Sequence, residues 1–403
     1  MNIVEVRIGQ RYRLSSLIGK GLFSEVFEGE NVYTGERVAI KLEDSKIRYQ
    51  QVNFESQILK HLQGGLGIPI PYWCGQEGDY NCLVMELLGD SLGTLKQRCK
   101  GKFSLKTTLM LADQLLTILE FIHSETIVHR DLKLENILMG IDNAFFQVHL
   151  IDFGLSKRFI DPSNNKHIPM KTGKTLLGSV EYASIPNHNG KELSRRDDME
   201  SLAYILCHML MGDLPWSNLV GPDKAQENEE RVLALKMRFS ESESLSKLPQ
   251  EFKIFLDSSK SLSFEDEPKY LEYRRMFKEL MVREGHSFDY IYDWILIPAS
   301  GQVAAQLNAI DDLLDIEDAL TKEEEAEIAA LMQKYESDPT VMDYRLEDIR
   351  KQNKKFDVIS PTSSPKASMV EERRVEGGKG KKGEEGAGGK KGKGGKGDNC
   401  LLI

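Results

Sequence analysis

The chain has 403 residues, a formal net charge of −10 and a hydrophobic fraction of 40%. This length is sufficient for a core of two lobes with additional segments. The five cysteines show no CxxC pairing, which argues against a disulfide framework or a zinc site. We identify no secretory leader and no apolar run of about 18 residues that could span a bilayer. Asn2 excludes N-myristoylation.

Charge is distributed unevenly along the chain. Residues 351–403 carry 13 Lys/Arg against 7 Asp/Glu, whereas residues 300–350 carry 4 against 14. The sequence therefore predicts three regions: a folded domain at 10–298, an acidic helical extension at 299–350, and a disordered Gly/Lys-rich tail at 351–403. We expect two acidic helices with an apolar stripe in the extension, at 311–320 and 323–335. The tail has too few apolar residues to form a core.

A glycine-rich turn occupies residues 18–26 (Ile-Gly-Lys-Gly-Leu-Phe-Ser-Glu-Val), between two strand-like runs at 11–18 and 26–33. Glycine has no Cβ, so backbone N–H groups in such a turn can close over phosphates. Ser24 stands where the strict GxGxxG pattern has its third glycine. Taken alone, the run is equally consistent with an ordinary hairpin turn.

The next strand, residues 38–41, ends with Lys41 after three apolar residues. A lysine at such a position is more often solvated. Here a predicted helix at 50–62 carries Glu55, spaced so that its carboxylate can point at Lys41. This pair indicates a lysine that is held in place to bind phosphate.

Two further motifs follow in the order that phosphoryl transfer requires. Residues 129–136 read His-Arg-Asp-Leu-Lys-Leu-Glu-Asn, and residues 152–154 read Asp-Phe-Gly. Asp131 would lie beside the incoming hydroxyl, while Asn136 and Asp152 would hold a metal ion. This spacing is the signature of protein kinases.

The remaining pattern predicts an α+β fold with two lobes. The sequence is strand-rich as far as Leu87, apart from the helix at 50–62, and mostly helical afterwards. Apolar residues at helical spacing predict further helices at 104–123, 201–211 and 269–284. We expect a small strand-rich N-terminal lobe and a larger helical C-terminal lobe, with phosphates bound between them.

The chain lacks the Ala-Pro-Glu motif that ends the activation segment of most protein kinases. It has instead Gly-Ser-Val-Glu-Tyr-Ala-Ser-Ile-Pro-Asn-His at 178–188 and Ser-Arg-Arg-Asp-Asp at 194–198. Over residues 10–298 it resembles the casein kinase I family, from which Leu134, where the family usually has Pro, is a minor departure. Further matching segments are residues 63–69, 84–89, 214–216 and 288–294.

The resemblance implies a serine/threonine kinase that uses ATP and Mg²⁺. Asp131 would be the catalytic base, Lys133 would contact the transferred phosphoryl group, and Asn136 and Asp152 would bind Mg²⁺. Asp198 is expected to cap the following helix and to brace the catalytic loop. The residues that would bind ATP, several of which could equally be plain core, are Ile18, Gly19, Gly21, Val26, Ala39, Lys41, Glu55, Met85, Glu86, Leu88, Leu138 and Ile151.

The resemblance also bears on substrate choice. The family favours acidic or already phosphorylated substrates, bound at basic pockets beside the activation segment. In one pocket this chain has Glu181 where relatives have Arg, and the acidic run 227–230 where relatives have Lys/Arg. These acids could instead form only a solvated face. A second anion site in relatives matches Arg130, Lys157 and Lys171, which we expect to converge without a carboxylate partner.

The chain ends in Cys400-Leu401-Leu402-Ile403, a CaaX box preceded by seven lysines between residues 379 and 396. Prenylation of Cys400 together with these lysines would form a two-signal membrane anchor. The terminal Ile favours geranylgeranyl over farnesyl. We therefore expect a cytoplasmic enzyme, peripheral on the cytosolic face of a membrane, although the tail could be only a basic linker.

The expected partners are protein substrates and an anionic membrane surface, with no nucleic acid, and we expect a monomer. The alternative function is a pseudokinase-like membrane scaffold. Such proteins usually lose Lys41, Asp131 or Asp152, and this chain retains all three.

Overall fold

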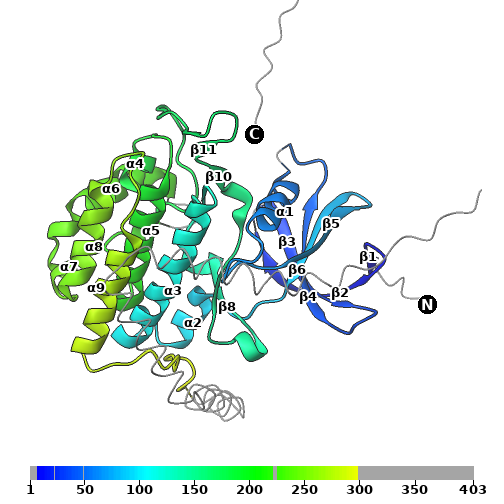
Figure 1. The fold of residues 1–403 in the computed structure, drawn as a ribbon, viewed down its shortest axis with the longest axis horizontal. Helices are drawn as coiled ribbons and strands as arrows, with labels where there is room; N and C mark the ends of the chain where they lie inside the picture. The colour runs from blue at the N-terminus through cyan, green and yellow to red at the C-terminus, as the bar shows by residue number, and fades with distance from the viewer. Residues whose placement is uncertain (1–6, 22, 49, 221–224, 298–403) are drawn as a thin grey trace, which may run out of the picture. The chain divides into compact units, whose positions relative to one another are not determined.

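The computed structural model describes residues 7–21, 23–48, 50–220 and 225–297. Its N-terminal part is a six-stranded antiparallel sheet with one helix, α1 (Gln51–His61), beside it (Figure 1). The strands, in their order across the sheet, are β1 (Arg7–Ile8), β2 (Tyr12–Lys20), β3 (Ser24–Asn31), β4 (Arg37–Asp44), β6 (Tyr80–Glu86) and β5 (Pro71–Glu77).

The alternation of side chains along β4 divides the two faces of this sheet. Val38 and Ile40 point to one face, where they join a small apolar cluster with strands β1, β2 and β6. Ala39, Lys41 and Glu43 point to the other face, as successive residues of a strand must. Ala39 belongs to the main core, which also includes residues of α1. Lys41 and Glu43 therefore lie on the face that bears α1.

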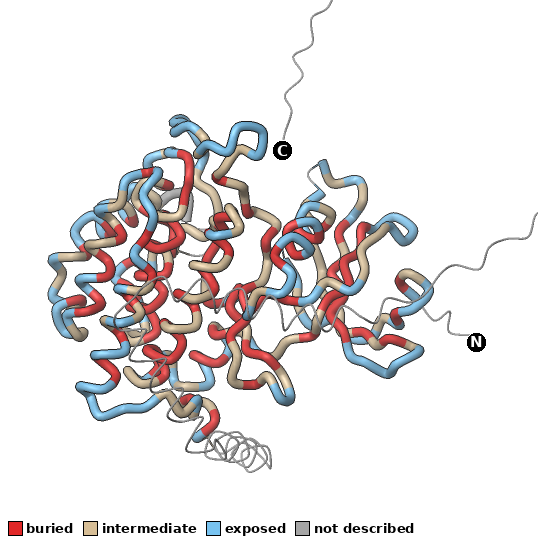
Figure 2. The backbone as a smooth tube through the Cα atoms, viewed as in Figure 1, coloured by how far each residue is buried: buried red, intermediate tan, exposed pale blue. Residues whose placement is uncertain are grey.

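The C-terminal part is helical and surrounds two long buried helices, α3 and α5. Figure 2 shows that buried residues run along both of these helices, while α6 to α9 are exposed on their outer faces. The helices are α2 (Leu92–Arg98), α3 (Leu105–Ser124), α4 (Ile185–His188), α5 (Arg195–Met211), α6 (Ala225–Arg238), α7 (Glu243–Ser246), α8 (Gln250–Ser261) and α9 (Tyr270–Arg283).

Helix α5 begins at Arg195, so the prediction of a helix over 201–211 was too short. At the start of the helix, the backbone N–H of Ser194 donates to Oδ2 of Asp197 at 2.8 Å, which is one half of a capping box. The first two turns carry buried polar residues, including Asp197, Asp198 and Glu200. Hydrophobic periodicity cannot detect such a segment, because burial here is compensated by hydrogen bonds. The predicted helices at 50–62, 104–123 and 269–284 agree with α1, α3 and α9 to within one residue.

Short strands bring the functional loops together at the side of the helical part that faces the sheet. The catalytic motif lies between β7 (Ile127–Val128) and β8 (Ile137–Met139), and the Asp-Phe-Gly motif follows β9 (Val148–Leu150). The strand β7 pairs with β10 (Lys157–Arg158), and β8 pairs with β9. The strands β11 (Ile160–Asp161) and β12 (Lys166–His167) form a small hairpin.

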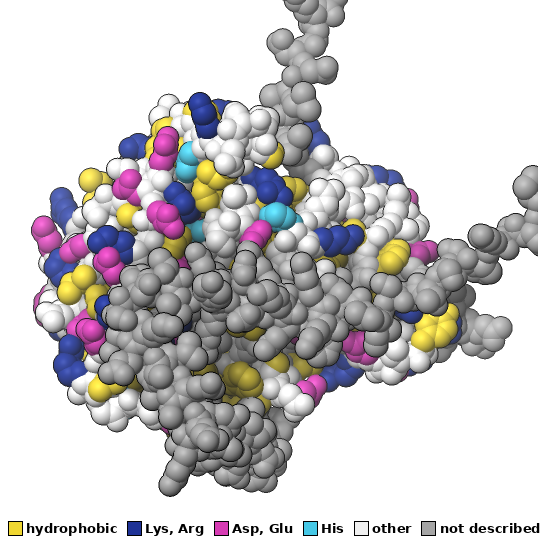
Figure 3. Space-filling view, viewed as in Figure 1, with side chains coloured by type: hydrophobic (Ala, Val, Ile, Leu, Met, Phe, Trp, Pro, Cys, Tyr) yellow, Lys and Arg dark blue, Asp and Glu magenta, His cyan; other side chains and the backbone are white. Residues whose placement is uncertain are grey.

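Basic and acidic side chains are interspersed over the described surface that is visible in Figure 3. None of the described helices is both long and apolar enough to cross a membrane. The predicted helices at 311–320 and 323–335, the basic tail and Cys400 lie outside the described residues.

Candidate active site

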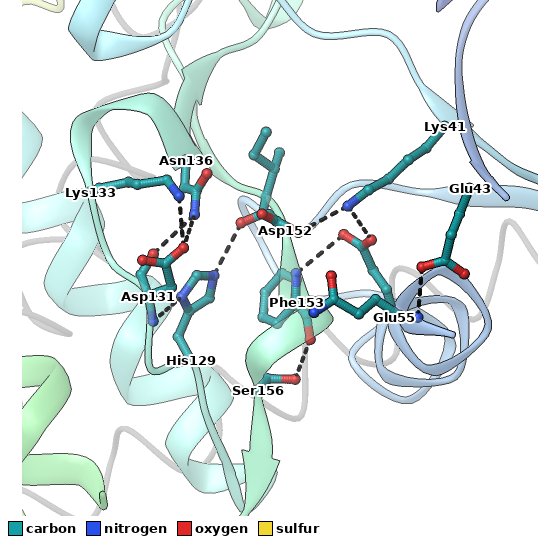
Figure 4. A network of polar contacts seen from close by, with 12 residues as sticks. Lys41, Glu43, Glu55, His129, Asp131, Lys133, Asn136, Asp152, Phe153 and Ser156 are labelled. Carbon is teal, nitrogen blue, oxygen red and sulfur yellow. Dashed lines mark hydrogen bonds and ion pairs between the residues drawn. The ribbon is translucent and has the colours of Figure 1, made fainter. Parts of the chain in front are cut away.

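Lys41 sits between two carboxylates, as Figure 4 shows. Its Nζ lies 2.6 Å from Oε2 of Glu55 on α1 and 2.9 Å from Oδ1 of Asp152. Burial alone would lower the pKa of Lys41, but the two carboxylates outweigh this effect and raise the pKa above its ordinary value. Lys41 is therefore a permanent cation that links strand β4, helix α1 and the Asp-Phe-Gly segment.

Asp131 is held from several sides in the loop between β7 and β8. Its Oδ2 lies 2.7 Å from Nζ of Lys133, and its Oδ1 accepts a hydrogen bond from the backbone N–H of Ser179 at 2.9 Å. The amide of Asn136 donates to the Asp131 carbonyl oxygen at 2.9 Å. Gly178 permits this approach, because a Cβ at that position would lie 2.8 Å from Oδ1 of Asp131. The activation segment thus packs directly against the carboxylate.

The catalytic loop is braced by Asp198, which lies in the first turn of α5. Its two oxygens accept hydrogen bonds from the backbone N–H groups of His129 and Arg130, at 2.8 and 2.9 Å. Nε2 of His123 donates to the same carboxylate at 2.9 Å. Burial opposes ionisation, but the contacts with His123 and these donors keep the pKa of Asp198 below its ordinary value. The bracing role is therefore present, whereas the side chain that bonds to the start of the helix is that of Asp197, which accepts from the backbone N–H of Ser194.

Five apolar residues expected to bind ATP come from the strands β3, β4, β6 and β8 and from the segment that follows β9. The strands β4 and β6 place Ala39 opposite Met85, and both are buried. Val26 of β3 borders the same apolar cluster. Leu138, in β8, and Ile151, which precedes Asp152, are only half-buried. Val26, Leu138 and Ile151 are thus partly exposed, as a surface that receives a ring requires, whereas Ala39 and Met85 are as buried as core residues.

The remaining residues expected to contact ATP lie at the ends of strands. Gly19 pairs with Val26 across β2 and β3, and the N–H of Gly21 donates to the Ser24 carbonyl at 2.8 Å. This turn closes without a third glycine. Ile18, at the same turn, is 49% exposed. Glu86 ends β6, and Leu88 follows it at the connection to the helical part.

The side chains of Asn136 and Asp152 fit a magnesium ion. Hard cations prefer carboxylate and amide oxygens, and Mg²⁺ usually takes one or two protein carboxylates with phosphates and waters completing its shell. The Asn136 amide nitrogen is engaged with Asp131, and no hydrogen bond to its Oδ1 occurs among the described residues. Asp152 adopts φ 65° and presents a carboxylate that is 36% exposed. In the described ranges no three His, Cys, Asp or Glu side chains form a metal cluster.

The contacts at the predicted anion site differ from the expected ones in two respects, and the binding of an anion there stays a prediction. A carboxylate occupies it, because Oε1 of Glu192 lies 3.0 Å from Nζ of Lys157 and 3.9 Å from Arg130. The third cation is Lys174, whose Nζ lies 3.6 Å from Oε2 of Glu192. Lys171 is exposed and contributes only its backbone carbonyl, which accepts from the N–H of Glu192. One carboxylate therefore faces three cations, and the expectation that the cations converge without a carboxylate partner is wrong.

Glu181 does not belong to a solvated face. Its side chain is 20% exposed, and Oε1 accepts a hydrogen bond from Oγ of Ser217 at 2.6 Å. Burial raises the pKa of the Glu181 carboxyl. The Glu181 carbonyl accepts from the indole N–H of Trp216 at 2.8 Å. Of the acidic run at 227–230, Glu229 lies 3.8 Å from His188.

Sequence reasoning missed a buried lysine that supports the activation segment. Lys236 of α6 is fully buried, and its Nζ donates to the carbonyls of Val180 and Ala183 at 2.7 and 2.6 Å. It also lies 3.2 Å from Nε2 of His188. Burial lowers the pKa of Lys236 to about 7. Its position at the end of an amphipathic helix carries no sequence signal for this role.

A family model described as the protein kinase domain matches residues 12–267, which is more than half of the chain. The chain therefore belongs to the protein kinase family. Members of this family transfer phosphate from ATP to proteins, and the strand-rich and helical parts described above form the two lobes of that fold.

Proposed function

We propose that this chain is a serine/threonine kinase of the casein kinase I type that uses MgATP. The observation that carries the proposal is the placement of Lys41 within hydrogen-bond distance of both Glu55 and Asp152, with Asp131 held nearby. This arrangement joins the two lobes around the position that phosphates would take. The serine/threonine preference and the family type rest on the sequence motifs at 178–188 and 194–198.

Each residue has a distinct part in the proposed reaction. Lys41, fixed by Glu55, orients the phosphates of ATP. Asp131 accepts the proton of the substrate hydroxyl, and Lys133, only 2.7 Å from it, offers a positive charge to the transferred phosphoryl group. Asn136 and Asp152 would hold Mg²⁺, which when bound neutralises charge on the phosphates.

The alternative, a pseudokinase-like scaffold, is disfavoured by the geometry of these same residues. A scaffold has no need to bury the Lys41 ammonium against two carboxylates. Burying charges costs free energy that is recovered only when the partners are well placed. Here the side chains of Lys41 and Glu55 are 9% and 2% exposed.

The kinase proposal is tested with the purified full-length chain and a library of serine- and threonine-containing peptides. Asp131→Asn and Lys41→Met should each abolish phosphoryl transfer, because neither substitute can accept the proton or hold the phosphates. Both variants should retain the cooperative thermal unfolding of the unaltered chain. Substantial transfer activity in either folded variant would contradict the assignment.

We also propose that the enzyme acts at the cytosolic face of a membrane. The support is the CaaX box at Cys400 and the seven lysines before it. A prenyl chain alone gives only reversible binding, and each basic residue adds about 1 kcal/mol near an anionic leaflet. The three-region organisation at 10–298, 299–350 and 351–403, and the monomeric state, are part of the same proposal.

A further inference from the structure

Glu43 is a buried carboxylate that has no cationic partner among the described residues. It lies two residues after Lys41 on β4 and is only 1% exposed. Its Oε1 accepts a hydrogen bond from the backbone N–H of Gln51 at 2.8 Å, and its Oε2 lies 3.4 Å from the Asn81 amide nitrogen. A carboxylate loses favourable hydration when it is buried, so other groups must stabilise its charge.

The N-terminus of α1 provides this stabilisation. The helix has no hydrogen bond from its own N-cap side chain, that of Gln50, and no acidic residue in its first turn. The first N–H groups of a helix lack partners within the helix and carry a positive partial charge. The carboxylate of Glu43, on the neighbouring strand β4, supplies both an acceptor for these N–H groups and a negative charge at the start of the helix. In return, the helix begins at a fixed position against β4.

A second contact between α1 and β4 lies one helical turn further along α1. Glu55 follows Gln51 by four residues, so the two share one face of α1. Lys41 and Glu43 share one face of β4. Figure 4 shows the two resulting contacts side by side, Lys41 with Glu55 and Glu43 with the start of α1. The buried apolar residues of α1 hold the helix on the sheet, and the two polar contacts one turn apart add a fixed orientation relative to β4.

The start of α1 also touches the Asp-Phe-Gly segment. A Cβ built on Gly154 would lie 3.4 Å from the Cβ of Gln51. The backbone N–H of Phe153 donates to Oε1 of Glu55 at 3.2 Å. Movement of the first turn of α1 would therefore disturb both the Lys41 pair and the segment that carries Asp152.

We propose that Glu43 is a positioning residue that fixes α1 in the orientation in which Glu55 pairs with Lys41. The inference rests on the proposed kinase function, since the pair serves phosphoryl transfer. Glu43 itself touches neither ATP nor substrate. It acts through the position of the helix.

Kinetics of the full-length chain test this role. Glu43→Ala should lower kcat/KM for ATP by about tenfold or more, because a hydrogen bond to a charged group is lost at the helix start. Glu43→Gln should lower kcat/KM for ATP by a smaller factor, since the amide oxygen of the glutamine can still accept from the backbone N–H of Gln51. The matched control is Glu251→Gln, which removes another buried carboxylate, paired with Arg283 at 2.6 Å. The control should alter thermal stability without altering kcat/KM.

A double-mutant cycle distinguishes positioning from general stabilisation. If Glu43 acts through the Lys41–Glu55 pair, the pair is already weakened in a Glu55→Gln background. There, Glu43→Ala should lower kcat/KM for ATP by less than about twofold. An equal loss in both backgrounds would show that Glu43 acts independently of the pair, and would overturn the inference.

Hydrogen exchange gives a readout that does not depend on activity. In Glu43→Ala the amides of α1 (Gln51–His61) should exchange faster than in the unaltered chain, while those of α3 should not change. Unchanged exchange in α1 would refute the role of Glu43. Absence of kinase activity in the unaltered chain would count against the proposed function instead, and the exchange result would still decide the role of Glu43.

Discussion

Glu181 places a negative charge beside the activation segment, where it can affect which peptides bind. Its carboxylate is fixed by Ser217 and lies 4.0 Å from His208, whose pKa burial lowers to about 4. His208 is therefore neutral at pH 7 and does not cancel the charge. A phosphorylated residue docking here would meet a carboxylate of like sign.

We therefore predict weak dependence on a phosphate three positions upstream of the target residue. Glu181→Gln keeps an acceptor for Ser217 while removing the charge, and should improve kcat/KM for primed peptides by about fivefold, since like charges at 4 Å repel by roughly 1 kcal/mol in water. The expected change for unprimed peptides is none. Glu181→Arg should shift the preference further in the same direction. A tenfold preference for primed peptides in the unaltered enzyme would disprove the charge argument.

Individual residues also mark the limit of what the sequence predicts. Lys41, Glu55 and Asp131 were predictable because each lies in a short motif with fixed spacing. Glu192 was not, since its partner Lys157 is 35 residues away and only the folded activation segment brings them together. The prediction named Lys171 where the structure has Lys174 for a similar reason, because a loop has no periodicity that indicates which side chain points inward.

At the scale of secondary-structure elements, α6 and the activation segment are joined through Lys236. Its ammonium can donate to Val180, Ala183 and His188 at once. The neutral amine retains two N–H donors for the carbonyls and can accept from His188, whose pKa burial lowers to about 3. Both protonation states of Lys236 therefore keep the contact intact.

This lysine should give the protein a measurable pH dependence of stability. The folded pKa is about 7, below the ordinary 10.5, so between these values the unfolded chain binds more protons than the folded chain. The contribution of Lys236 to the free energy of unfolding should then rise with pH, by roughly 1.5 kcal/mol between about pH 7 and 8.5. Chemical denaturation at several pH values measures it. Lys236→Met should remove this rise in the free energy of unfolding. If the free energy of unfolding depends on pH equally in the two proteins, the prediction is wrong.

Element boundaries were predictable where apolar spacing alone determines them. Helix α3 is such a case, with twelve buried residues in twenty positions. The start of α5 was not predictable from apolar spacing, because Asp197 and Glu200 are buried there through hydrogen bonds to Ser184 and Tyr204. Of these two partners, Ser184 is identified only by the fold, because it lies 13 residues before Asp197 and outside the helix.

At the scale of the whole molecule, the proposed membrane anchor separates location from catalysis. Cys400→Ser should move the protein from the membrane to the soluble fraction and leave activity on soluble peptides unchanged, because the cysteine lies far along the chain from the kinase motifs. Cell fractionation and peptide assays measure the two effects. Replacing the seven lysines between 379 and 396 should weaken membrane binding without preventing lipidation.

Mass spectrometry of the protein from its native cell provides the decisive measurement. A prenylated, shortened C-terminus at Cys400 is expected. An unmodified C-terminus that still ends in Leu401-Leu402-Ile403 would mean that the tail is only a basic linker.

The hydrogen bond between Tyr270 and His123 has a practical consequence for anyone who shortens this chain. The family match ends at residue 267, three residues before Tyr270, whose hydroxyl lies 2.6 Å from Nδ1 of His123. His123 in turn holds Asp198 under the catalytic loop. Further along, Asp293 holds Ser104, the N-cap residue of α3, by accepting from its backbone N–H and its hydroxyl. A recombinant fragment cut at the edge of the family match would thus lose supports of its own catalytic centre, and expression clones should extend past Asp293.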